Sequence, residues 1–504
     1  MKTSMIALVA ALTATPALAA EDADKNAGTI IVTARSNADD PAVVAEARAR
    51  LAETDLLRDV PGVLSNKRYG EEARLSIRGS GIDQSYHQRG VMIAQDGVPF
   101  ADADGFSDFQ KVDALGARYI EVYKGGNAIR FGGAQLGGAV NLVTPNGKNV
   151  ESENLLRLEA GSFDTYRGQV ALGRQVGNFD FYGSVSGAQS NGYRINSGLK
   201  QVRGTVNIGY SFGEDREIRL IGYVADINQD VPGTLTVAQA LATPEAAGAG
   251  VVANKWARDQ NVQRVTLQTR YRFSDSLLFE GGIYTTWTDL HHPIAITIDQ
   301  KIDTQGAFGR FSWDGQLAGH KADMFFGAYY RQGTNKQGLF VNMGGVNGFQ
   351  FGKSSMDASG LDVFAEGRFW ATETLAVVAG GSYGRATRDY SDLLNSGNDR
   401  TKNFNWFSPR FGLLWQNADG VQVYANVTRS VEPPHYLALL QQGINGFVPV
   451  DSQRAWTAEI GTRGKSGAFT WDATFYRSWV DGELLTFSAN SGLPATFFNA
   501  GKTT

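Results

Sequence analysis

The stretch that decides the fold runs from Arg264 to Phe273 and reads RVTLQTRYRF. Every second residue of an extended chain faces the same side, so this stretch separates into two sets. One set is mostly apolar and the other is polar: Val265, Leu267, Thr269, Tyr271 and Phe273 against Arg264, Thr266, Gln268, Arg270 and Arg272. Such alternation predicts a β-strand that lies between an apolar and a polar medium.

The same alternation recurs along the chain from about Asn154 onward. Further copies begin at Phe179, Leu361 and Val421. These segments are longer than the strands of about 5–6 residues that are usual in globular proteins. They approach the roughly 9–11 residues that a tilted strand needs to cross a membrane. The pattern therefore favours a transmembrane barrel over a soluble sandwich.

The connections between these segments alternate between tight and long. A tight one lies at 176–178, and long ones lie at 227–260, 288–303 and 334–357. Short turns at one rim and long loops at the other are typical of an outer-membrane barrel. We expect a mainly β protein with about fifteen or sixteen antiparallel transmembrane strands in this chain.

Composition excludes several classes of function. The 504 residues include 60 glycines and no cysteine, and 47 basic residues nearly balance 51 acidic ones. Without cysteine there are no disulfides and no thiolate metal sites, and the balanced charge gives no basic field for nucleic acid. The carboxylates are scattered, with no recognisable triad or metal-ligand spacing, so we expect no enzyme, no cofactor and no metal site.

The N-terminus has the features of a secretory signal peptide. Lys2 gives a positive start, residues 5–14 are apolar, and Ala-Leu-Ala at 17–19 offers a cleavage site. The apolar run is too short to span a bilayer. We therefore expect residues 1–19 to direct export from the cytoplasm and to be removed.

Residues 20–41 form a polar flank that contains one β-prone run. This run consists of Thr29, Ile30, Ile31, Val32, Thr33 and Ala34. It is either an edge that awaits a partner strand or the first strand of the next domain.

Residues 42–150 read as a small α/β domain. A helical composition at 41–57 is followed by strand-like segments at 75–78, 91–96 and 118–123. The glycine-rich stretch that comes next lacks the spacing of a phosphate-binding loop. The barrel domain would then occupy residues 151–504.

Seven short motifs give the chain a specific resemblance. In order they are LRDVPGV at 57–63, RG at 78–79, QDGVP at 95–99, IEVYKG at 120–125, FGGAQLGGAVN at 131–141, FSPRFG at 407–412 and YANVTRS at 424–430. With these motifs the chain resembles the TonB-dependent outer-membrane receptors, in particular those for ferric citrate and related iron chelates. The run at 29–34 resembles the TonB box of that family.

The resemblance implies a multi-pass outer-membrane protein in which residues 42–150 form a plug inside the barrel lumen. It implies active uptake of a ferric chelate of the siderophore or citrate type, energised by TonB through residues 29–34. Another metal complex, cobalamin or an oligosaccharide is the alternative solute, and an adhesin or a passive channel is a more remote alternative. The expected surroundings are outer-membrane lipid, and the expected state is a monomer.

Barrels of this family have about 22 strands. The resemblance therefore implies that the last strands are missing here and that the natural gene continues past Thr504.

Plug segments that face the exterior are the expected ligand contacts. They carry hydrogen-bond donors and cations suited to an anionic chelate, and one lumen arginine joins them. The candidates are Tyr86, His87, Gln88, Arg89, Phe106, Asn127, Arg130 and Arg388. In each case the alternative is a residue that merely packs against the barrel wall.

The resemblance also implies a charged lock between plug and barrel. In the family, two plug arginines at the positions of Arg78 and Lys124 meet barrel glutamates, and Glu459 matches the first of these. Lys124 keeps the positive charge but loses the bidentate fork of arginine. We expect Arg78, Lys124 and Glu459 to meet in the lumen.

Overall fold

The computed structural model describes Leu57 and residues 60–82, 88–132, 134–150, 152–440, 447–487 and 496–504. The predicted signal peptide, the β-prone run at 29–34 and nearly all of the predicted helix at 41–57 lie outside the described residues.

Two small sheets form the plug, by which we mean strands β1 to β6 and the segments between them. β1 and β2 make an antiparallel hairpin, and the other four strands form a sheet in the order β4-β3-β6-β5, with β3 and β6 parallel. The predicted strands at 75–78, 91–96 and 118–123 correspond to β2, β3 and β5. The bounds are β1 Val63–Tyr69, β2 Glu72–Ile77, β3 Val91–Gln95, β4 Val98–Pro99, η1 Phe109–Lys111, β5 Tyr119–Lys124, η2 Gly125–Ala128 and β6 Gly138–Val143.

One antiparallel sheet of 16 strands forms the wall, as the alternation predicts. Consecutive strands from β7 to β21 pair with one another, and β24 pairs with β21. The bounds are β7 Asn154–Gly161, β8 Thr165–Val176, β9 Phe179–Ser190, β10 Leu199–Gly213, β11 Arg216–Gln229, β12 Asp259–Ser274, β13 Leu277–Pro293, β14 Ile296–Leu317, β15 His320–Asn342, β16 Asn347–Trp370, β17 Leu375–Asp392, β18 Arg400–Gln416, β19 Gln422–Glu432, β20 Gln453–Ser466, β21 Phe469–Asp481 and β24 Lys502–Thr503.

Short elements lie in the connections of the wall. They are α3 Val237–Ala242, η3 Ser396–Asn398, α4 Tyr436–Leu439 and the hairpin of β22 Leu484–Phe487 with β23 Thr496–Asn499. No helix among the described residues is long and apolar enough to cross a membrane.

The two sets of side chains in Arg264 to Phe273 lie in two different environments. Val265 and Leu267 are 42% and 40% exposed on the outer face, whereas Arg264 and Thr266 are each 3% exposed on the inner face. An exposed apolar face this extensive requires an apolar medium, and the inner face meets polar protein. The period-two pattern thus specifies which side of each strand faces lipid.

The two rims of the wall differ, but less than the sequence suggests. At the tight-turn rim, where for example β8 meets β9, Gly177 takes a positive φ of 58° to close a short turn. At the opposite rim, called the long-loop rim, the connection 227–260 is long and contains α3. The expectation of long loops at 288–303 and 334–357 is wrong, because the strands there continue as paired hairpins.

The exposed apolar side chains of the outer face form a band around the wall, which we call the apolar belt. The hairpin extensions keep their backbone groups paired beyond this belt. Leu290 pairs with Gln300, and Lys336 pairs with Ser355. Antiparallel pairing satisfies the N–H and C=O groups of both strands wherever neighbouring strands remain adjacent. The number of residues between two apolar segments of the sequence therefore does not tell whether they are joined by a long loop or by an extended hairpin.

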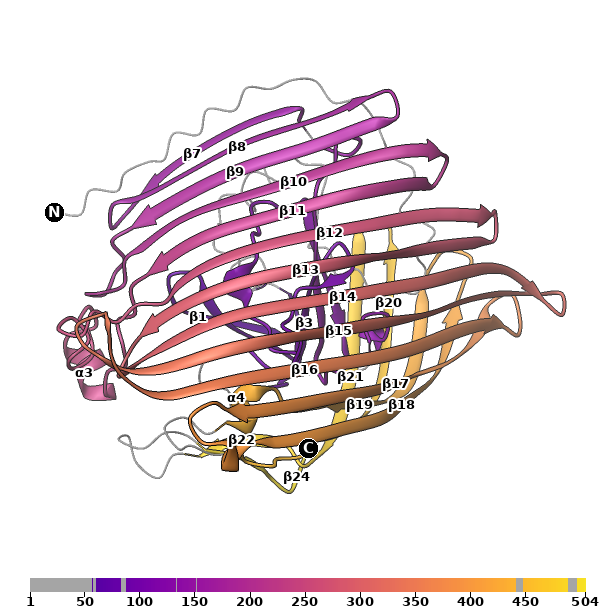
Figure 1. Cartoon of the computed structure of the whole chain (residues 1–504). Coiled ribbons are helices and arrows are strands. Elements are labelled where there is room, and N and C mark those ends of the chain that lie inside the picture. Colours follow the sequence, from indigo (N-terminus) through magenta and orange to yellow (C-terminus); the bar gives the residue numbers. More distant parts are fainter. Residues whose placement is uncertain are drawn as a thin grey trace.

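The wall curves around the plug (Figure 1). A shared apolar core joins the two, with Leu75 and Ile93 of the plug packed in one cluster with Tyr223, Ile227 and Val262 of β11 and β12. The plug is therefore seated against β11 and β12 by apolar packing, and its other sides meet the polar inner face.

We predict that Leu267→Arg destabilises folding into a bilayer far more than Gln263→Arg does. Both positions face outward on β12, but Leu267 lies in the apolar belt and Gln263 nearer the long-loop rim. The expected losses are about 2–4 kcal/mol for Leu267→Arg and about 1 kcal/mol or less for the control. Denaturant titration in lipid vesicles measures both, and equal losses would contradict the assignment of the lipid face.

Candidate functional site

Arg78 of the plug forms a buried ion pair with Glu459 of the wall. The chain turns sharply after β2, with positive φ at Arg78 (54°) and Gly79 (83°), and this turn directs Arg78 toward β20. Its Nη1 lies 2.5 Å from Glu459 Oε2, and the two side chains are 8% and 3% exposed. Asn426 donates to the other oxygen of Glu459 at 2.6 Å, and the ring of Tyr476 lies 4.6 Å from the Arg78 guanidinium carbon.

Lys124 lies near this pair but does not join it directly. Burial lowers the pKa of the Lys124 ammonium, and the positive charge of Arg78 lowers it further. The carboxylates of Asp472 and Glu459 act in the opposite direction and raise it. Among the described residues Lys124 makes no ion pair. The structure therefore brings two of the three predicted lock residues into contact and leaves the third beside them.

Two further buried ion pairs join plug acids to wall arginines, and the sequence analysis missed both. Arg203 on β10 lies 2.7 Å from Glu71, and Arg258, just before β12, lies 2.7 Å from Asp108. All four side chains are at most 8% exposed. Arg203 occupies an inward position of its strand, so the alternation marks it as facing the lumen but does not identify its partner.

The plug loop at 102–106 is held at the long-loop rim by hydrogen bonds that the wall region donates to it. Arg331 Nε donates to the carbonyl of Ala103 at 3.2 Å, and Arg388 donates to the carbonyls of Asp104 and Pro434. The backbone N–H of Tyr436, at the start of α4, donates to Asp104 Oδ2 at 2.8 Å. The ring of Phe106 meets the ring of His435 edge-on at 5.7 Å.

The predicted ligand contacts separate into several groups. Tyr86 and His87 lie outside the described residues. Gln88 and Arg89 are each 3% exposed, and Arg89 Nε lies 3.6 Å from Glu432 Oε1 on β19. Arg388 is 1% exposed, so a ligand reaches its guanidinium only after the 102–106 loop moves.

Asn127 and Arg130 lie on the tight-turn side of the plug and do not form an apex at the long-loop rim, and their contact with a ligand stays a prediction. Asn127 Oδ1 accepts from Arg410, which lies in the half of β18 that is nearer the tight-turn rim. Arg130 lies against the ring of Phe325, near the start of β15 at the same rim. The glycines of η2 allow this close approach, since a Cβ on Gly126 would lie 2.4 Å from Thr428 Oγ1.

The tip of the β1–β2 hairpin is a further plug segment at the long-loop rim. Asn66, Lys67 and Arg68 are exposed there. Gly70 packs so tightly on Gln229, the last residue of β11, that a Cβ would overlap its amide. The sequence signal was present as a polar run ending in glycine, a common turn composition.

Histidine, aspartate and glutamate do not gather into a metal-binding group of three or more within the described part of the chain. The geometry provides a plug that is held by buried ion pairs at several levels of the wall and by carbonyl contacts near the long-loop rim.

Two family models match the chain. "TonB-dependent Receptor Plug Domain" matches residues 45–139, and "TonB dependent receptor-like, beta-barrel" matches residues 144–504. A plug seated against the inner face of an antiparallel membrane wall is the architecture that these models describe. The chain belongs to the TonB-dependent receptors, which are proteins of the outer membrane.

Individual relatives are more distant. The vitamin B12 transporter BtuB of Vibrio cholerae serotype O1 is 28% identical over 179 residues, which cover 35% of this chain and 27% of that protein. The rhizobactin receptor of Rhizobium meliloti (strain 1021) is 23% identical over 482 residues, covering 79% of this chain and 64% of that receptor. The matches thus span less than two thirds of these relatives.

Solved structures share the fold. The ferric yersiniabactin uptake receptor FyuA from Yersinia pestis superposes with a TM-score of 0.70 at 17% identity, covering 89% of this chain and 71% of that one. The unliganded ferric citrate transporter FecA superposes with a TM-score of 0.71 at 15% identity, covering 87% of this chain and 68% of that one.

We predict that Glu459→Ala loosens the plug. The substitution leaves the Arg78 guanidinium buried without its carboxylate, and such a loss costs about 3–5 kcal/mol. Limited proteolysis of the plug and the free energy of unfolding measure the effect.

Glu153→Ala is the matched control for Glu459→Ala. Glu153 pairs with Arg174 at 3.6 Å, but the two side chains are 65% and 51% exposed. Removing an exposed pair costs about 1 kcal/mol or less. Equal effects of the two substitutions would show that the Arg78–Glu459 pair does not hold the plug.

Proposed function

We propose that this receptor takes up a ferric chelate across the outer membrane, using energy delivered by TonB. The observation that carries the proposal is the seated plug: a wall whose inner side is occupied in this way cannot act as an open pore for a large solute. Transport then requires the plug to move, and movement requires an external source of energy. The proposal assigns no catalytic step to the chain and treats the receptor as a monomer.

Residues 29–34 are the proposed attachment point for TonB. The run is β-prone and lies in a polar flank ahead of the plug. An extended segment of this kind binds a partner by adding a strand to its sheet edge, with backbone hydrogen bonds as the main contacts.

An anionic chelate fits the contacts around the 102–106 loop. Arg331 and Arg388 donate there to neutral carbonyls. Carboxylate, phosphate and similar anions accept stronger hydrogen bonds from guanidinium groups than carbonyls do. We propose that an arriving ligand competes for these donors, and that Phe106 and the tip of the β1–β2 hairpin contact it first.

A ferric siderophore or ferric citrate is the proposed substrate class. The rhizobactin receptor, FyuA and FecA are named for such ligands or for their uptake. The vitamin B12 transporter among the relatives makes cobalamin the alternative. Competition between an iron chelate and cobalamin for binding to the receptor distinguishes the two.

We predict that Ile31→Pro abolishes uptake and leaves binding at the cell surface unchanged. Proline removes one backbone donor and restricts the residue before it, so strand addition to TonB fails. Accumulation of a radiolabelled ferric chelate by energised cells measures uptake, and retention by de-energised cells measures binding.

Ala27→Pro is the matched control, because it introduces the same restriction in the polar flank outside the β-prone run. Uptake by this variant should stay near that of the unmodified receptor. Normal uptake by the Ile31→Pro variant would overturn the proposed coupling, and loss of surface binding by the same variant would show a general defect instead.

A further inference from the structure

The two faces of the larger plug sheet are covered in different ways. This sheet has the order β4-β3-β6-β5. On one of its faces, Val91, Ile93 and Val140 lie in an apolar core that the plug shares with the wall. The plug does not complete this core by itself, so lifting this face off the wall would expose apolar side chains to water. The wall residues of the core belong to β11 and β12 and are Tyr223, Ala225, Ile227 and Val262.

The opposite face of the same sheet is covered by plug residues alone. Its side chains come from the alternate positions of the strands, such as Met92 and Ala94 of β3. The buried members of this cluster, all in the described part of the plug, are Met92, Ala94, Ala101, Tyr123, Ala128, Phe131 and Ala139. Moving this face away from the wall therefore leaves its own core covered.

Buried ion pairs add to the apolar attachment on β10 to β12, which we call the anchoring side. The pair of Arg203 with Glu71 and the pair of Arg258 with Asp108 both lie there. Removing one partner of a buried pair leaves an uncompensated charge. Separation on this side would therefore break two buried pairs and open the shared core at the same time.

Wall side chains of β15 to β18 hold the plug through neutral acceptors. Tyr329 Oη donates to the carbonyl of Gly97 at 2.9 Å. Arg331, Arg388 and Arg410 each donate to a backbone carbonyl of the plug. An anionic solute is a stronger acceptor for a guanidinium group than a carbonyl is, so it can take over these donors when the plug leaves them.

Apolar contact with the plug is slight on β15 to β18. Two of the buried clusters that include residues of these strands contain one plug residue each, Ile129 in one and Ala103 in the other. The next strands, β19 and β20, add ion pairs to the plug at Glu432 and Glu459. We call β15 to β20 the opening side, because separation there breaks polar contacts without opening the core of the plug.

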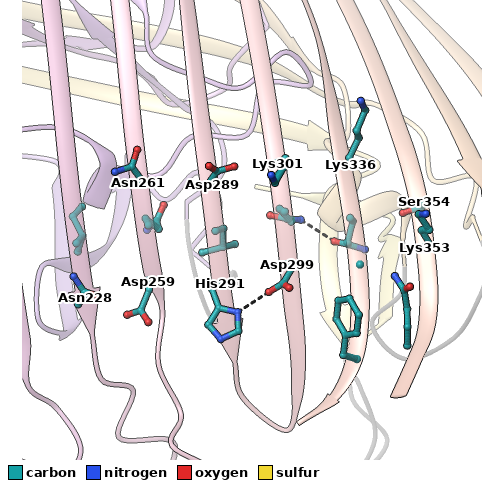
Figure 2. Close-up of a pocket in the computed structure, with 18 of the residues that line it drawn as sticks. Asn228, Asp259, Asn261, Asp289, His291, Asp299, Lys301, Lys336, Lys353 and Ser354 are labelled. Atoms are coloured by element: carbon teal, nitrogen blue, oxygen red, sulfur yellow. Dashed lines mark hydrogen bonds and ion pairs between the residues drawn. The ribbon is translucent and has the colours of Figure 1, made fainter. Parts of the chain in front are cut away.

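The wall itself offers no gap in either region, because neighbouring strands from β10 to β20 are paired with one another. Figure 2 shows β11 to β16 around a pocket on the wall, with the plug behind the strands. Near the long-loop rim, His291 Nδ1 of β13 lies 2.7 Å from Asp299 Oδ1 of β14, which adds a side-chain contact to the backbone pairing. A passage for the solute must therefore form between plug and wall.

We propose that the plug moves as a hinged body during transport: it stays seated on the anchoring side and separates from the opening side. The ferric chelate then passes between plug and wall along the inner face of β15 to β18. Arg331 and Arg388 meet it near the long-loop rim. Arg410 meets it about 26 Å further along the wall, since eight residues of β18 separate it from Lys402, which pairs with Arg388. This inference rests on the proposed function and adds the side on which the plug opens.

Two single-cysteine variants of the full-length receptor test the hinge. Thr428 of β19 and Thr205 of β10 are matched positions, because both lie next to a plug glycine and are 5% and 6% exposed. The chain has no cysteine, so Thr428→Cys and Thr205→Cys each introduce one thiol. Cells supplied with ferric citrate are labelled with a maleimide in the presence and absence of metabolic energy. Energy should speed the labelling of the Thr428→Cys variant several-fold and leave that of the Thr205→Cys variant unchanged.

A disulfide on the anchoring side gives a second measurement. A Cβ on Gly116 of the plug would lie 3.3 Å from Thr205 Oγ1, which is within reach of a disulfide. Oxidised Gly116→Cys/Thr205→Cys receptor should take up ferric citrate at nearly the unmodified rate. The matched link on the opening side, Gly126→Cys/Thr428→Cys, should stop uptake. Binding of ferric citrate at the cell surface shows that each oxidised receptor is folded, and if a double variant does not fold, the labelling comparison decides alone.

Two results would overturn the hinge while leaving energised uptake in place. One is uptake that stops on oxidation of the Gly116→Cys/Thr205→Cys receptor and returns on reduction, because the plug then leaves the anchoring side. The other is energy-dependent labelling that is equal in the two single-cysteine variants. Uptake that persists with both disulfides formed would contradict the proposed function as well, because the solute would then cross without movement of the plug.

Discussion

Charges that are buried between plug and wall need partners, and this constraint organises the lumen. Glu71 and Asp108 of the plug are compensated by Arg203 and Arg258 of the wall region, whereas Arg78 of the plug is compensated by Glu459 of the wall. Breaking any one of these pairs without replacement leaves a charge in a poorly hydrated place. The seated plug is therefore a definite state, and leaving it requires work.

The same strands that supply these partners also face the membrane, because their side chains alternate. One register places basic residues against the plug and apolar residues against lipid, and a shift by one residue would exchange the two. Beyond the apolar belt the outer face becomes polar, and there the strands continue as paired hairpins. Lipid contact and plug retention thus follow from a single pairing register.

Local pattern sufficed to predict the fold, but the contacts of the site depend on long-range geometry. Alternation such as that of Arg264 to Phe273 identified the wall, and motif order identified the plug. Strand continuation past Leu290 could not be predicted, since polar residues suit both loops and exposed hairpins. The placement of Asn127 on the tight-turn side of the plug depends on Arg410, 283 residues away in the chain. Arg78 and Glu459 were paired by family resemblance, not by any signal in their own neighbourhoods.

Movement of the plug relative to the wall is the central claim, and a reversible cross-link tests it most directly. The chain has no cysteine, and a Cβ on Gly126 of the plug would lie 3.0 Å from Thr428 Cβ on β19, close enough for a disulfide after slight relaxation. In Gly126→Cys/Thr428→Cys receptor, oxidation should stop ferric chelate uptake without reducing surface binding, and reduction should restore uptake. Uptake at the unmodified rate by fully cross-linked receptor would contradict the account.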